Sequence, residues 1–172
     1  MNTQCNSKQL HFQGLGSRKV VADFDGGTIT SDAGALLLRE IEAANHFFDD
    51  FASCFVDYRD PDQIEHTVES LIKQRVMGLA LGYEDLNDHD TLRHDPLLAL
   101  LSDKQDLSGK TRKRDQDKGR ALAGKSTLNR LELTPLDADA ASRYKKIVAD
   151  IEGMDDLLVE LFHEAHDTPP AE

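Results

Sequence analysis

Two aspartates placed two residues apart, Asp23 and Asp25, have the residue types and spacing of a reactive site. Gly26, Gly27 and Thr28 follow them. An aspartate in such a position can attack phosphorus as a nucleophile while its neighbour handles the proton. Here an extra glycine separates the second aspartate from the threonine, which changes the backbone amides that face such a site. The alternative is a Gly-Gly turn whose small residues let the backbone reverse before a helix.

A second pattern runs from Gly119 to Ser126 and matches G-x-x-x-x-G-K-[ST], the phosphate-binding loop of nucleotide hydrolases. That loop works only where a buried strand leads in and a helix leads out, because the backbone amides then converge on phosphate. The preceding residues 110–118 read KTRKRDQDK, which is not a buried strand. The alternative interpretation is a basic loop that leads into a helix.

The charge of the chain is unevenly distributed. The 172 residues carry a formal net charge of −12, which as a whole disfavours nucleic-acid binding because phosphates attract Lys and Arg. Residues 104–130, however, hold nine Lys and Arg against three acids, a net +6 that leaves −18 for the rest. Local asymmetry of this kind steers a charged ligand. The basic segment is therefore the expected contact with DNA.

A helix is expected over residues 126–133, with Ser126 as its capping residue. The spacing turns Leu128 and Leu131 toward the core and leaves polar side chains outside. Exposed Ser, Thr, Asn and Arg side chains at a helix start suit contact with phosphates and bases. The residues predicted to bind DNA are Arg112, Lys113, Arg114, Lys125, Ser126, Thr127, Asn129 and Arg130.

Metal and membrane functions find little support in the sequence. Cys5 and Cys54 have neither metal-ligand spacing nor a disulfide framework, and His163 and His166 lie three apart without a third ligand. No metal-binding and no catalytic residue is therefore predicted. The N-terminus lacks a signal-peptide stretch and no apolar run is long enough to cross a bilayer, so a cytoplasmic protein is expected.

The pattern of the chain is mainly that of helices, with one or two short strands near residues 19–30. Leu37, Ile41 and Ala44 are spaced at i, i+4 and i+7, which predicts the buried face of one helix. Strands and helices do not alternate along the chain, so a parallel α/β sheet is not expected.

Composition divides the chain into four parts: a helical N-terminal region over residues 1–102, a flexible basic linker over 103–119, a helical segment over 120–166 and a disordered tail over 167–172. Residues 1–17 carry little pattern and are expected to be loose. A helix-turn-helix-like element is expected at 122–133. Two later helices, 137–151 and 154–166, are expected to be bent or split at Gly153.

Four stretches, in order along the chain, carry a resemblance to a known family. They are ADFDGGTITSDAGALLLREIE (Ala22–Glu42), DYRDP (Asp57–Pro61) with IEH shortly after, QRVMGLALGYEDLNDHDTLRHDP (Gln74–Pro96) and LAGKSTLNRLE (Leu122–Glu132). Together they resemble the N-terminal part of a bacterial insertion-sequence transposase of the DDE type, group 1. The similarity runs from about residue 12 to the end.

The resemblance implies that the Asp-Gly-Gly-Thr segment is a structural turn. In that family three acids of a ribonuclease-H-like core bind two divalent metals, such as Mg²⁺, for strand cleavage and joining. The first acid is expected after a region like residues 157–172, so the chain is expected to be a truncated transposase that is inactive alone and holds no cofactor. Its helical region is expected to recognise the terminal inverted repeats of the element.

Two alternatives remain open. One is a helical interaction module that pairs with the full-length transposase, or with a second copy of itself, and inhibits transposition. The other is a haloacid-dehalogenase-like phosphohydrolase built on Asp23 and Asp25. DNA binding favours the transposase fragment, and hydrolysis of a phosphate ester with magnesium favours the phosphohydrolase.

Overall fold

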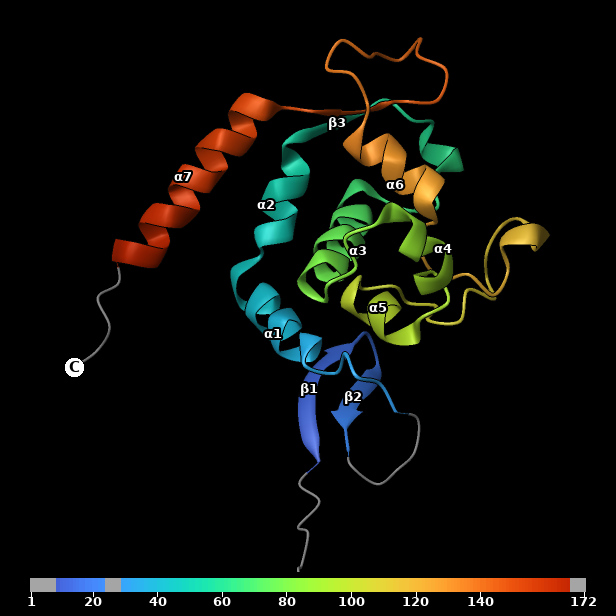
Figure 1. Ribbon diagram of the computed structural model, residues 1–172, viewed down its shortest axis with the longest axis vertical. Helices are drawn as coiled ribbons and strands as arrows, with labels where there is room; N and C mark the ends of the chain where they lie inside the picture. Colours follow the sequence, from blue (N-terminus) through green and yellow to red (C-terminus); the bar gives the residue numbers. More distant parts are fainter. Residues whose placement is uncertain (1–8, 24–28, 168–172) are drawn as a thin grey trace, which may run out of the picture.

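The computed structural model of the protein describes residues 9–23 and 29–167, and these form a mainly helical fold (Figure 1). This confirms the mainly helical character that was predicted from the sequence. The helices are α1 (Ala35–Asn45), α2 (Phe47–Ser53), α3 (Val68–Ala80), α4 (His89–Leu92), α5 (Pro96–Leu101), α6 (Lys125–Glu132) and α7 (Ile151–Asp167), with the 3-10 helices η1 (Pro61–Gln63), η2 (Leu86–Asp88) and η3 (Asp115–Asp117). The strands are β1 (Leu10–Leu15), β2 (Arg18–Ala22), β3 (Phe55–Asp57) and β4 (Ile147–Ala149).

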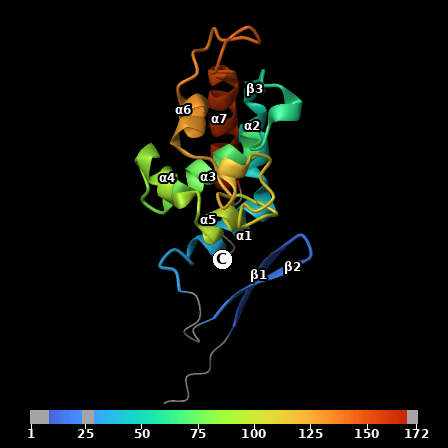
Figure 2. The same ribbon diagram turned by 90° about the vertical axis from the view of Figure 1, so that its right-hand side faces the viewer.

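Strands β1 and β2 form an antiparallel hairpin at the end of the molecule away from α6 (Figures 1 and 2). Strand β2 lies where a short strand was predicted. The prediction that residues 1–17 are loose was wrong for β1. Apolar and polar residues alternate from Leu10 to Gln13, but Gly14 ends this alternation after four residues, and only Leu15 of the strand is buried. The predicted Gly-Gly turn, at residues 24–28, lies outside the described residues.

Helix α3 lies at the centre of the molecule and contributes side chains to two buried clusters. Met77 packs in a cluster with residues of the hairpin, α1, α5 and residues 121–122. Leu71 and Ile72 pack in a second cluster with residues of α6 and β4. Both faces of one helix are thus covered, and α6 is held against the same helix as the N-terminal elements.

The buried face of α1 differs from the predicted one. Leu37 and Ile41 are 62% and 52% exposed, whereas Arg39 is 5% exposed and Glu42 is 7% exposed. Arg39 is buried because its guanidinium donates to the Gln13 carbonyl at 2.8 Å and pairs with Asp103 at 2.9 Å. An ion pair with hydrogen bonds lets a charged side chain replace an apolar one at this contact.

Residues 102–124 contain no regular structure apart from η3, but many contacts hold them in place. Asp106 accepts hydrogen bonds from the backbone and side chain of Thr111, at 2.7 and 2.8 Å. The Gly119 amide donates to the Gly109 carbonyl at 3.0 Å. Helix α5 ends at Leu101 and α6 begins at Lys125, so a long irregular segment separates the two helices. The predicted helix-turn-helix geometry is not confirmed.

Strands β3 and β4 pair antiparallel, with Phe55 opposite Ala149. Each strand has only three residues, which is too short for an alternating pattern to be recognised, and neither was predicted from the sequence. Their pairing continues in a hydrogen bond from the Tyr58 amide to the Lys146 carbonyl at 2.8 Å. Two segments far apart in the sequence, near residues 59 and 144, are thus brought to the same side of α6.

Helix α7 starts after β4 and runs along one side of the molecule (Figure 1). The predicted helix over 137–151 was wrong, because residues 137–146 are irregular. Gly153 lies inside the first turn of α7 instead of splitting a helix. The Asp150 side chain caps this turn by accepting from the Gly153 amide at 3.1 Å. In the part of the chain that the structure describes, none of the helices has the length and apolar character of a membrane span.

Candidate nucleic-acid interface

Helix α6 presents the face that was predicted for it. Leu128 and Leu131 are buried, at 0% and 7% exposure, and the helix begins one residue before Ser126, at Lys125. The prediction that Ser126 is the cap was wrong. Gly124 is the capping residue in an extended conformation, and the Lys125 amide donates to the Asp90 carboxylate at 3.2 Å. This leaves the Ser126 side chain exposed at the helix start.

The phosphate-loop pattern at Gly119–Ser126 lacks the strand that it needs. Residues 110–118 form turns and η3, and residues 120–124 are irregular. Gln74 holds the backbone of Ala123 from both sides, accepting from its amide at 3.0 Å and donating to its carbonyl at 2.8 Å. The amide of Ala123 is therefore engaged in the fold instead of facing a phosphate-binding loop.

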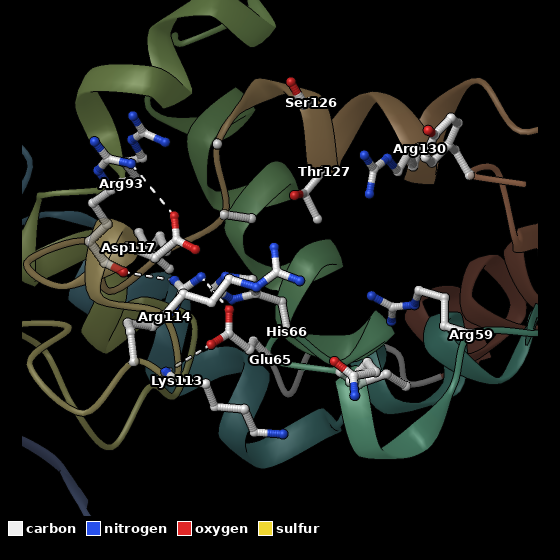
Figure 3. Close-up of a pocket in the computed structure, with 18 of the residues that line it drawn as sticks. Arg59, Glu65, His66, Arg93, Lys113, Arg114, Asp117, Ser126, Thr127 and Arg130 are labelled. Carbon is white, nitrogen blue, oxygen red and sulfur yellow. Dashed lines mark hydrogen bonds and ion pairs between the residues drawn. The ribbon is translucent and has the colours of Figure 1, made fainter.

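A basin of about 590 Å³ opens beside α6, and nine of the 22 residues that line it are Lys or Arg (Figure 3). Its Lys and Arg residues are Arg59, Arg93, Arg112, Lys113, Arg114, Arg120, Arg130, Arg143 and Lys146, and its acids are Asp60, Glu65, Asp90 and Asp117. The lining is strongly positive in a chain of net charge −12. Such a concave basic surface focuses the electrostatic field on an anionic ligand.

The basin brings together six of the eight residues predicted to bind DNA: Arg112, Lys113, Arg114, Ser126, Thr127 and Arg130. Two of these also have structural contacts. Arg112 pairs with Glu65 at 2.7 Å and donates to the Arg120 carbonyl at 2.8 Å, while Lys113 donates to the Asp62 carbonyl at 2.6 Å. Their binding of DNA stays a prediction, and Arg112 is the least available of the set because both ends of its guanidinium are engaged.

The other two predicted residues, Lys125 and Asn129, line a second groove of about 560 Å³ on the opposite flank of α6. This groove also contains Lys145 and the exposed Tyr144. Ser126, Arg130 and Tyr144 line both hollows, so α6 stands as a ridge between the basin and the second groove. Lys125 is paired with Asp90 at 3.4 Å.

Five cationic residues of the basin were not predicted from the sequence: Arg59, Arg93, Arg120, Arg143 and Lys146. Arg59 follows β3, and Arg143 and Lys146 precede β4, so the pairing of these strands brings them together. Arg120 lies within the basic segment and was within reach of the charge argument. No local signal marks the others, because three-residue strands leave no readable period.

Tyr144 is an aromatic residue at the rim of both hollows and is 57% exposed. The guanidinium carbons of Arg143 and Arg130 lie 4.8 and 5.6 Å from its ring centroid. Contacts of this kind hold a guanidinium beside an aromatic face. The ring therefore positions two cations at the edge of the basin.

The floor of the basin contains His66, which is 5% exposed. Burial, together with the nearby positive charges of Lys104, Arg112 and Arg59, lowers the pKa of His66 to about 3. Neither ring nitrogen has a hydrogen-bond partner among the described residues. The imidazole is consequently neutral at physiological pH, and the positive charge of the basin comes from its arginines and lysines.

Glu65 contacts the basic segment through Arg112 and Lys113. Burial acts to raise the pKa of its carboxyl, but the hydrogen bonds from Arg112 and Lys113 outweigh burial and the pKa lies below its ordinary value. Glu65 is thus ionised and neutralises Arg112. Around it, Arg114 and Arg130 form no ion pair with a carboxylate in the described residues.

Within residues 9–23 and 29–167, no three His, Cys, Asp or Glu residues are grouped as the ligands of a metal ion.

The chain was compared with protein families, curated proteins and solved structures. The family model described as transposase DDE domain group 1 matches residues 12–172. No curated protein and no solved structure matches the chain. The matched range contains α6 and every residue that lines the basin and the second groove.

Proposed function

The chain belongs to the transposase DDE domain group 1 family, and from this we propose that its α6 face binds the DNA at the ends of a mobile element. The resemblance predicted from four stretches of the sequence is thereby confirmed, and the function of the chain is related to DNA transposition. The observation that supports the α6 face as the DNA contact is the basic basin in an acidic chain. The acidic remainder disfavours DNA at other faces.

The ridge formed by α6 suits the geometry of duplex DNA. An α-helix with its side chains is about 10–12 Å across, close to the width of about 12 Å of the major groove. The edges of that groove carry phosphates on both sides, and α6 is flanked by cations in both hollows. We therefore place the α6 ridge in the major groove, with Arg114 and Lys113 at one backbone and Lys145 at the other.

Different residues have different roles in this proposal. Contacts to phosphate position a protein without reading sequence, whereas contacts to base edges specify it. Asn129 lies on the flank of α6 away from the basin, and an Asn amide can pair with an adenine edge. We assign sequence preference to Asn129 and non-specific affinity to the cations.

The proposal is tested by a salt titration of binding to an element-end duplex and to a scrambled duplex. With about four to six phosphates contacted, log affinity falls with log salt at a slope of about −4 to −5. Reversing Lys113 and Arg114 to Glu weakens binding to both duplexes alike and flattens the slope. Asn129→Ala reduces the preference for the element end by about 1–3 kcal/mol.

The matched control reverses Arg18 and Lys19, two exposed cations of the hairpin at the far end of the molecule. This variant has the same change in net charge and should keep the parent slope. Equal losses in the two reversed variants would show that only net charge matters. Absence of binding to either duplex at low salt would remove the proposal.

A second candidate is the interaction module that pairs with a full-length transposase. It is favoured by α7, which carries the exposed apolar side chains Ile151, Leu158, Val159 and Phe162. Large exposed apolar residues on one helix are typical of surfaces that bind other proteins. Association with the transposase in the absence of DNA, lost in Phe162→Ser, supports this candidate.

The phosphohydrolase alternative gains no support from the described residues. Its fold needs parallel strands, and β1 to β4 form only antiparallel pairs. Asp23 accepts a hydrogen bond from the Gln9 side chain at 2.7 Å, and Asp25 lies outside the described residues.

A further inference from the structure

Three guanidiniums from separate parts of the chain converge in the basin. Arg59 follows β3, Arg114 lies in the irregular segment before η3, and Arg130 is on α6. Figure 3 shows their side chains reaching into the same space, which Thr127 borders from above and His66 from below. The fold thus gathers three like charges around one point.

Such an arrangement is unfavourable in the free protein unless an anion joins it. Arg114 and Arg130 have no carboxylate partner among the described ion pairs, and Arg59 shares Asp57 in a contact of 2.7 Å. The Arg130 guanidinium lies over the Tyr144 ring, with 5.6 Å between its central carbon and the ring centroid. Arg114 and Arg130 are therefore positioned by the fold without a carboxylate to neutralise them, whereas Arg59 pairs with Asp57 through its Nε and Nη2 atoms.

The chemistry of the cluster selects phosphate among common anions. A guanidinium offers parallel N–H donors in a planar fork that matches the oxygens of phosphate. The forks of Arg114 and Arg130, the Nη1 donors that Asp57 leaves to Arg59, and the Thr127 hydroxyl can surround a tetrahedral anion from several directions, which a planar carboxylate cannot use fully. The basin, at about 590 Å³, also leaves space for the group to which the phosphate is attached.

We propose that Arg59, Arg114 and Arg130, with Thr127, form a phosphate-binding subsite in the basin. This rests on the proposed DNA binding only for the source of the phosphate, because the subsite binds the phosphate group itself. It receives a phosphate that projects out of the nucleic acid, either a backbone phosphodiester or the terminal phosphate of a DNA end. It adds an anchoring point to the α6 ridge at a fixed distance from Asn129.

The subsite is tested first with inorganic phosphate and the full chain. The arginine Nε–H resonances are followed by NMR while phosphate replaces chloride at constant ionic strength. Saturable shifts of the Arg114 and Arg130 resonances are expected. Arg114→Lys and Arg130→Lys keep the charge but lose the fork, and each should weaken phosphate binding about tenfold or more, the equivalent of one charge-assisted hydrogen bond. The control Arg18→Lys should leave it unchanged.

A second experiment identifies the source of the phosphate and separates the two proposals. Duplexes with and without a 5′-terminal phosphate are compared for the parent and for Arg114→Lys. Tighter binding of the phosphorylated duplex, lost in the variant, assigns the subsite to a terminal phosphate. An equal loss for both duplexes assigns it to the backbone.

The remaining outcomes decide against one proposal or the other. Phosphate binding without DNA binding keeps the subsite and removes the proposed function. DNA binding that is the same in parent, Arg114→Lys and Arg130→Lys, with no saturable phosphate response, overturns the subsite and leaves the proposed function in place.

Discussion

A single buried amide determines where α6 starts. Gln74 is 0% exposed, and its side chain contacts both backbone groups of Ala123 and the Nδ1 atom of His89 at 3.1 Å. A buried amide of this kind is stable only when its donors and acceptors are paired. Ala123 directly precedes the Gly124 cap, so this contact on α3 aligns α6 with the rim of the basin.

The buried imidazole of His66 predicts a dependence of stability on pH. Its pKa in the folded protein is about 3, below the ordinary value of 6.5 that applies to the unfolded chain. Between these values the unfolded state binds a proton that the folded state does not, so the free energy of unfolding falls as the pH falls below 6.5. From pH 7 to pH 5 the contribution of His66 should fall by about 2 kcal/mol.

The measurement is urea unfolding of the parent and of His66→Gln at both pH values. The variant lacks the titrating group, so its loss between pH 7 and pH 5 should be about 2 kcal/mol smaller. The titratable groups of Glu65 and His89 are present in both proteins and cancel in the comparison. The same loss in parent and variant would contradict a buried neutral His66.

At the scale of elements, the irregular segment between α5 and α6 is held in a defined conformation by its contacts. Arg112 pairs with Glu65, and the Asp106 carboxylate caps its own turn. Close backbone approach occurs at Gly109, where a β-carbon would lie 2.5 Å from Arg120 backbone atoms. The basic residues of the segment are consequently held at the basin while its backbone lacks repeating structure.

Gly109→Ala is predicted to destabilise the protein by about 2 kcal/mol or more. Its backbone φ of 65° disfavours any residue with a β-carbon, and the added methyl group also meets the chain at Arg120. Thermal and urea unfolding measure the change. If the segment were a mobile linker, its backbone would relax around the added methyl group and the free energy of unfolding would change little.

The matched control is Gly119→Ala in the same segment. Gly119 has a φ of 83°, but its β-carbon would meet no atom within 4 Å. Only the conformational cost of about 1 kcal/mol is expected there. A difference between the two variants measures the packing of the segment, and equal small effects would support the flexible linker of the sequence analysis.

At the scale of the whole molecule, each of the two buried clusters contains residues from both sides of residues 103–119, the segment that composition predicts to be a linker. Leu122 packs with Leu15 and Leu36 of the first elements, and Leu128 packs with Leu71. Helix α3 contributes to both clusters. Separate domains on either side of residues 103–119 would each need a core of their own.

The molecule is therefore predicted to unfold from the hairpin to β4 in one cooperative transition. Calorimetry should give equal calorimetric and van't Hoff enthalpies, and the fluorescence of tyrosines on either side of the segment should change at one temperature. Tyr83 and Tyr144 provide these two probes. Two resolved transitions would show that the basic segment separates independent domains.

Properties that depend only on residues close together in the sequence could be predicted from the sequence. The mainly helical fold and the outward face of α6 follow from residue spacing, because neighbours at i+3 and i+4 share a helix face whatever lies elsewhere. The basic segment follows from counting charges. The family followed from stretches read in order, and its match covers residues 12–172.

The rest depends on contacts between distant residues, which no local pattern records. Strand β3 pairs with β4 across some ninety positions, and this pairing brings Arg59 to the same basin as Arg143 and Lys146. Arg39 is buried on α1 instead of Leu37 because Asp103, far along the chain, pairs with it. Burial and the meeting of like charges are set by packing of the whole chain, so the basin and its converging arginines appear only when the molecule is folded.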